Sequence, residues 1–175
     1  MARQLAFHVE GYPPGKNEAK SMLAADHLYA DRVLELLQCA KRATDDEGFC
    51  GFGAARIGLE VTVYSPDLLP PSDATNYLGG IGDVLEDKSR RGSLDHLGNL
   101  ASFGLYANDR QICEVAYRVA SAHNAGYYVR LWELDEPADQ PASWPPPVTS
   151  GASPIGPSLT ELNHLSGRVS REERD

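Results

Sequence analysis

The most informative part of the sequence is Ser72-Asp73-Ala74-Thr75-Asn76-Tyr77-Leu78-Gly79-Gly80-Ile81-Gly82-Asp83-Val84-Leu85-Glu86-Asp87. Two prolines precede it, and Ser72 or Asp73 can cap a first helical turn. Its apolar residues recur at helical spacing, at Leu78, Ile81 and Leu85. The stretch therefore predicts one short helix. Each of its glycines costs about 1 kcal/mol relative to alanine, so we expect a strand, a second subunit or a phosphate chain to approach this backbone closely.

The residues before this helix predict two strands with a helix between them. Leu5, Phe7 and Val9 alternate with polar residues, which is the pattern of a half-buried strand. Residues 27–42 carry apolar side chains at helical spacing, and a glycine-rich turn from Gly48 to Gly53 closes that helix. Strict alternation in residues 57–64 predicts the second strand.

The residues after the central helix predict a long loop and two further strands. The loop covers residues 88–106, with a helical turn near 94–100. Alternation in residues 113–119 and 127–131 predicts two strands, which we expect to pair as a hairpin. The fold class is thus α/β (α+β), with a small mixed sheet of about four strands packed against two helices.

Composition favours one soluble domain over residues 1–134. The chain has 175 residues, of which 42% are hydrophobic and 23% charged. We expect no signal peptide and no membrane span, so a cytoplasmic location is the default. Three scattered cysteines argue against a disulfide framework and a zinc knuckle. Residues 135–175 are rich in proline, serine and acidic residues, which predicts a disordered tail; its segment 144–147, Trp-Pro-Pro-Pro, is either a protein-partner motif or plain linker.

Three carboxylates are candidates for chemistry: Asp73, Asp83 and Asp109. Mg²⁺ and Mn²⁺ prefer hard oxygen ligands, so carboxylates that converge from a helix and from the entry to a strand would suit a metal-dependent phosphodiesterase. Asn76 lies seven residues before Asp83 and projects from nearly the same face of the helix. The alternative is structural: a helix cap, a solvated helix residue and a turn former. A net charge of −9 argues against a generally basic DNA-binding surface but does not exclude a local basic patch.

Two motifs carry a family resemblance. The loop Pro13-Pro14-Gly15-Lys16-Asn17 is similar to a Pro-Pro-x-x-Asn pattern, and residues 73–85 are similar to Asp-x-Asp-Asn-Leu-x-Lys followed by Asp-x-Leu. An acidic or amide pair before a strand appears as Asn108-Asp109. In this order, over about residues 4–134, the chain resembles the RusA-like Holliday junction resolvases. These are small, dimeric, magnesium-dependent endonucleases with a mixed α/β fold.

The resemblance implies a homodimer that acts on branched or double-stranded DNA with Mg²⁺ or Mn²⁺. It implies that Asp73 and Asp109 are metal ligands and that Asn76 shapes the site. Thr75 stands where the family has its second metal-binding aspartate and would be a neutral, weaker metal ligand, so Asp83 is the candidate for the second carboxylate. Gly79 stands where the family has a catalytic lysine. The candidates for phosphate contacts, some of which could replace that lysine, are Lys16, Asn17, Lys20, Lys88, Arg90, Arg91 and Arg110.

The resemblance leaves a second hypothesis open. With Thr75 and Gly79 in place of an aspartate and a lysine, the chain could keep the fold without the chemistry. It would then be a catalytically inactive module that binds nucleic acid or a protein partner, the latter through its proline-rich tail.

Overall fold

The computed structural model describes residues 2–16, 21 and 23–135. These residues fall in one compact unit, Met1–Pro137. The predictions made for Asn17, for Lys20 and for the tail beyond residue 135 lie outside the described residues.

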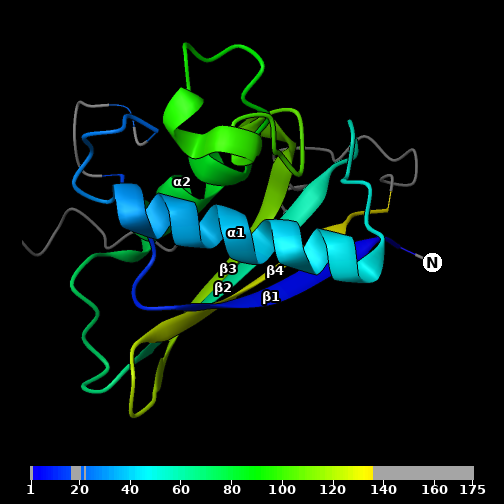
Figure 1. Cartoon of the computed structure of the whole chain (residues 1–175). Helices are drawn as coiled ribbons and strands as arrows, with labels where there is room; N and C mark the ends of the chain where they lie inside the picture. The colour runs from blue at the N-terminus through cyan, green and yellow to red at the C-terminus, as the bar shows by residue number, and fades with distance from the viewer. Residues whose placement is uncertain (1, 17–20, 22, 136–175) are drawn as a thin grey trace, which may run out of the picture. The chain divides into compact units, whose positions relative to one another are not determined.

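The core of the fold is a mixed sheet of four strands, as the sequence predicts. The strands are β1 (Gln4–Glu10), β2 (Ile57–Ser65), β3 (Ile112–Ser121) and β4 (Gly126–Glu133), in the spatial order β1-β4-β2-β3 (Figure 1). β4 runs antiparallel to both β1 and β2, whereas β2 and β3 are parallel. The parallel pair, β2 and β3, is joined by a crossover connection that contains α2, and this pair makes the sheet mixed.

The hairpin predicted for the last two strands is wrong. β3 lies at the edge of the sheet and pairs with β2, and β4 lies between β1 and β2. The connection 122–125 therefore crosses the end of β2. Apolar alternation records only which side chains face the core, and that is the same whether two consecutive strands are neighbours or are separated by a third.

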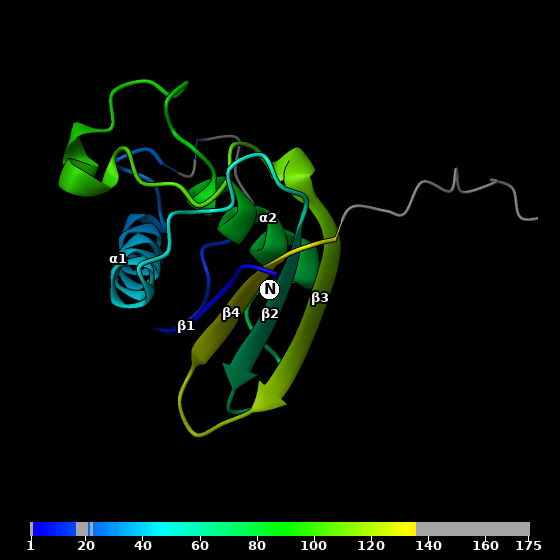
Figure 2. The same cartoon turned by 90° about the vertical axis from the view of Figure 1, so that its right-hand side faces the viewer.

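Two helices cover one face of the sheet (Figure 2). α1 (Ala30–Glu47) begins and ends later than the predicted range 27–42, and its C-terminus is closed by Gly48 in the left-handed conformation, with φ 61°. α2 (Ala74–Leu85) is the helix of the central stretch. Two 3₁₀ turns follow, η1 (Asp95–Leu100) and η2 (Asp109–Gln111). Within the described ranges, no helix is both long enough and apolar enough to cross a membrane.

The hydrophobic core lies between these helices and the sheet. Alternate residues of each inner strand point into it, which is why the period-2 pattern in the sequence is so clear. α2 contributes Tyr77, Ile81, Val84 and Leu85, and each is fully buried. The apolar stripe predicted for this helix is thus confirmed at Ile81 and Leu85, while Leu78 is only partly buried.

Two of the three glycines of α2, Gly79 and Gly80, face the loop that follows β1, and the third, Gly82, faces Ile112 at the start of β3. A Cβ at Gly80 would stand 2.0 Å from the carbonyl oxygen of Pro14. The next part of the loop is bonded to the same helix, because the backbone N–H of Lys16 donates to the carbonyl of Asn76 at 3.1 Å. The absence of a side chain at Gly80 therefore lets the first loop pack directly against the central helix.

Replacing Gly80 by alanine is expected to destabilise the protein by roughly 1–3 kcal/mol, because backbone atoms would have to move to admit the methyl group. Gly79→Ala is the matched control. There the nearest atom is Cδ of the flexible Lys16 side chain at 3.3 Å. Alanine at that position should be neutral or stabilising by up to about 1 kcal/mol. Urea unfolding of both variants measures the difference, and equal stabilities would contradict this packing.

Candidate functional site

Asp73 forms the N-cap of α2, one of the two caps that the sequence predicts. Its Oδ1 accepts hydrogen bonds from the Asn76 N–H at 2.9 Å and from the Thr75 hydroxyl at 2.7 Å. Its Oδ2 accepts from the Asn76 side-chain amide at 2.6 Å. The hydrogen bond from Thr75 and that from the Asn76 backbone lower the pKa of this exposed carboxyl group. Asp73 is therefore ionised and tied into the first turn of the helix.

Asp83 pairs with a lysine from the first loop. Lys16 Nζ lies 3.0 Å from Asp83 Oδ2, and the Asp83 side chain is only 18% exposed. To reach it, the Lys16 side chain passes over Gly79, where a Cβ would stand 3.3 Å from its Cδ. Residues 75, 79 and 83 share one face of α2, because they are spaced by four. Lys16 thus brings an ammonium group to the face on which Gly79 lacks a side chain.

Asp109 lies near the other end of the same helix. The chain leaves α2, forms the loop predicted for residues 88–106, and returns to the helix at Tyr106 before it reaches Asp109. The Tyr106 hydroxyl donates to the carbonyl of Gly82 at 2.7 Å, and the Asp87 N–H donates to the carbonyl of Tyr106 at 2.8 Å. These bonds fix the entry to β3 beside the C-terminal end of α2.

Tyr106 is buried beside the C-terminal end of α2. Burial raises the pKa of Tyr106 well above its usual range, and the charges of Glu86, Asp109 and Asp83 raise it further. The Tyr106 hydroxyl bonds to Gly82, the residue before Asp83, and Tyr106 lies three residues before Asp109, so both acids lie towards the same end of α2. Neither Tyr106 nor Glu86 was a site candidate from the sequence, because the tyrosine sits in a loop with no periodic pattern.

Asp73 does not belong to that region. Ten residues of α2 separate it from Asp83, which at about 1.5 Å per residue is roughly 15 Å along the helix axis. Partial burial raises the pKa of Tyr117, in the middle of β3, and the charge of Asp73 raises it further. Among the described residues, no group of three His, Cys, Asp or Glu side chains is arranged to hold a metal ion. One cation can therefore contact Asp83 or Asp73 within a single chain, but not both.

Lys88 does not offer a phosphate contact, contrary to the sequence prediction. Its side chain is 3% exposed, and its ammonium group donates to the carbonyls of Val84, Glu86 and Phe103 at 2.6, 3.0 and 2.6 Å. Burial lowers the pKa of Lys88 to about 8. Lys88 satisfies carbonyls left open at the C-terminus of α2 and ties the helix to the returning loop.

The other cations predicted for this region are at the surface. Arg90, Arg91 and Arg110 are exposed, and Arg91 pairs with Glu86 at 3.1 Å. Arg90 and Arg91 line a cavity of about 490 Å³ that also takes in Glu86 and Asn108, the residue before Asp109. This cavity therefore adjoins the end of α2 at which Asp83 and Asp109 lie.

Comparison with known proteins leaves the family open. No family model matches the chain, and no curated protein matches its sequence. The resemblance to the RusA-like resolvases thus stays a prediction from the sequence motifs.

Proposed function

We propose that the chain is a divergent RusA-like, magnesium-dependent, structure-selective endodeoxyribonuclease that acts in DNA recombination or repair. The observation that carries the proposal is the ion pair between Lys16 and Asp83 across Gly79. In the resemblance, Gly79 occupies the position of a catalytic lysine. Lys16 supplies the same charge to the same helix face from a different segment, where it pairs with Asp83.

The donor set fits one kind of metal site. Mg²⁺ usually keeps several waters and takes one or two carboxylates together with substrate phosphate oxygens, so it does not need three protein ligands. Asp83 and Asp109 would hold such an ion, with Tyr106 bracing the backbone between them. When bound, the ion would activate a water for attack on a phosphodiester and offset the charge that develops on the phosphate.

The cationic side chains have separate tasks in this proposal. Lys16, already 3.0 Å from Asp83, would exchange part of that contact for the scissile phosphate. Arg90, Arg91 and Arg110 would bind flanking phosphates of the DNA backbone. A homodimer would present two such sites with two-fold symmetry, which suits a branched substrate with paired strands.

The Asp73→Asn variant tests which acids hold the metal ion. The family resemblance names Asp73 as a ligand, whereas the proposal from the structure uses Asp83 and Asp109. Asparagine caps a helix as well as aspartate does, so the melting temperature should change little. We expect cleavage of a synthetic four-way junction with Mg²⁺ to fall by less than about tenfold, because a charge roughly 15 Å from the ion is largely screened by salt. A complete loss of cleavage in this variant, with Asp109→Asn still active, would move the ion to the N-terminus of α2.

A second candidate function is DNA binding without cleavage. Among the described residues, no three His, Cys, Asp or Glu side chains are arranged to hold a metal ion, which favours this alternative. Thr75 and Gly79, which stand where the family has an aspartate and a lysine, favour it too. A gel shift that weakens with salt, combined with no cleavage at any Mg²⁺ or Mn²⁺ concentration, would support it. No shift at low salt, with a pull-down that requires the tail, would instead support a protein-binding module.

A further inference from the structure

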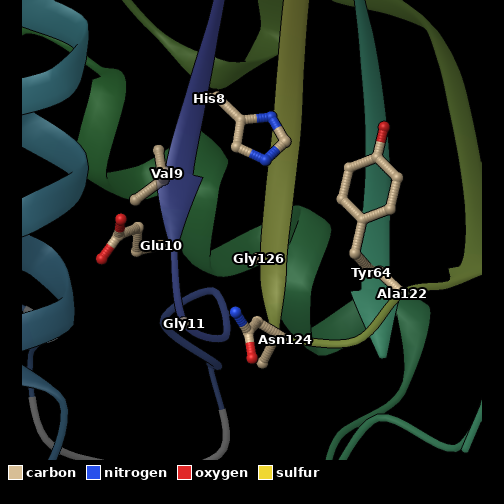
Figure 3. Close-up of a pocket in the computed structure, with 9 residues that line it drawn as sticks. His8, Val9, Glu10, Gly11, Tyr64, Ala122, Asn124 and Gly126 are labelled. Carbon is tan, nitrogen blue, oxygen red and sulfur yellow. The ribbon is translucent and has the colours of Figure 1, made fainter. Parts of the chain in front are cut away.

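The sheet carries a cavity on the face away from α2. It has a volume of about 500 Å³ and lies where β1 ends and β4 begins. His8, Tyr64, Asn124 and Gly126 are among the residues that line it (Figure 3). None of them belongs to the α2 site, so this cavity is a separate feature of the molecule.

The cavity exists because of Gly126. In the register of the sheet, Gly126 of β4 lies between Glu10 of β1 and Tyr64 of β2. The next outward-facing positions of β4 carry large side chains, namely Tyr128, Arg130 and Trp132. A Cβ at Gly126 would stand 3.3 Å from the Val9 carbonyl oxygen and 3.4 Å from His8 Nε2. Glycine therefore leaves a gap in an otherwise filled row, and the His8 ring lies over part of it.

Two aromatic rings border that gap. His8 and Tyr64 project from the strands on either side of β4, with ring centroids 5.3 Å apart and an interplanar angle of 37°. Figure 3 shows Asn124 opposite them across Gly126, with the Glu10 carboxylate directed away toward α1. Among the described residues, none forms a hydrogen bond with the His8 imidazole, the Tyr64 hydroxyl or the Asn124 amide. The polar groups at this gap are thus free for a ligand.

We propose that this cavity binds a nucleobase. A flat heteroaromatic ring can stack on the His8–Tyr64 pair and lie over the bare backbone of Gly126. The Asn124 amide both donates and accepts, which matches the adjacent donor and acceptor on the edge of a base such as adenine. No lysine or arginine lines the cavity, so a phosphate is not the group recognised. The base would come from a free nucleoside or from an unpaired nucleotide in a strand.

The inference does not depend on nuclease activity, and its test uses binding alone. Adenosine, a short single-stranded oligodeoxynucleotide and inorganic phosphate would each be titrated into the ¹⁵N-labelled full chain. We expect the first or second of these to shift the amides of Gly11, Asn124 and Gly126, and phosphate to leave them unchanged. Tyr64→Leu should weaken binding by about tenfold, which is the usual scale for one stacked base. Asn124→Ala should weaken it by about the same factor, because the hydrogen bonds of the amide are lost.

Matched variants keep the test decisive. Asn99→Ala removes an exposed amide from η1 and should bind as the wild type does. Asn124 is exposed in the β3–β4 connection, so its alanine variant is informative even if Tyr64→Leu fails to fold. Saturation by adenosine identifies a nucleoside site, and response to the oligonucleotide alone identifies a base within a strand. Shifts confined to other residues, or full binding by Asn124→Ala, would overturn the proposal.

Discussion

Replacing Asp109 by asparagine is expected to lower junction cleavage in Mg²⁺ by about 100- to 1,000-fold, the usual cost of removing one group that stabilises the transition state. Asparagine keeps the shape of the side chain but removes its charge. Asp109 is exposed at the start of η2, where Asn108 makes the capping hydrogen bond. The fold should therefore be unaffected, and the loss would report on the carboxylate itself.

Asp46→Asn is the matched control for that experiment. Asp46 is an exposed acid near the C-terminal end of α1, so the variant changes the net charge of the chain by the same amount. Initial rates on the same junction should match those of the wild type. Equal rates for Asp109→Asn and Asp46→Asn, with an active wild type, would exclude a catalytic role for Asp109.

Replacing Lys88 by methionine is expected to destabilise the protein by on the order of 3 kcal/mol. Methionine fills a similar volume but leaves three carbonyls without a donor, and each unsatisfied buried group costs about 1–3 kcal/mol. Since the pKa of Lys88 is about 8, the ammonium group is charged at pH 7 and makes all three hydrogen bonds. Denaturant unfolding at pH 7 measures this loss directly.

Lys41→Met provides the comparison for Lys88. Lys41 lies on the surface of α1 and pairs with Asp45 one turn away, at 2.5 Å. Such an exposed pair is worth only about 0.3–0.5 kcal/mol. If the two variants were equally stable, Lys88 would be a surface residue in solution, and its assignment as a phosphate contact would return.

The elements of the fold could be predicted from the sequence, but one of their pairings could not. Leu5, Phe7 and Val9 revealed the first strand because alternation reports burial directly, and Asp73 revealed the start of α2 because a cap has a local signature. The place of β4 between β1 and β2 has no such signature. The position of β4 depends on how the helices pack over the sheet, and this packing involves residues that are far apart in the sequence.

The sequence named candidate site residues, but the structure brings only some of them together. The first loop was expected to supply a cation, and the structure brings Lys16 to Asp83. Lys88 looked like a phosphate contact because it sits in the most basic run of the chain. Its burial follows from the return of the loop through Phe103, which no local pattern records. The glycines of α2 predicted that another segment packs closely on this helix, but they did not predict that this segment is the loop after β1.

The position of a bound divalent ion tests the central claim most directly. Mn²⁺ can be titrated into the ¹⁵N-labelled protein, because its paramagnetism broadens the signals of nearby amides. If Asp83 and Asp109 hold the ion, we expect selective broadening of the Asp83, Glu86 and Asp109 amides and its loss in an Asp83→Asn/Asp109→Asn double variant. Broadening centred on Asp73 and Thr75, or spread evenly over the acidic surface, would contradict it.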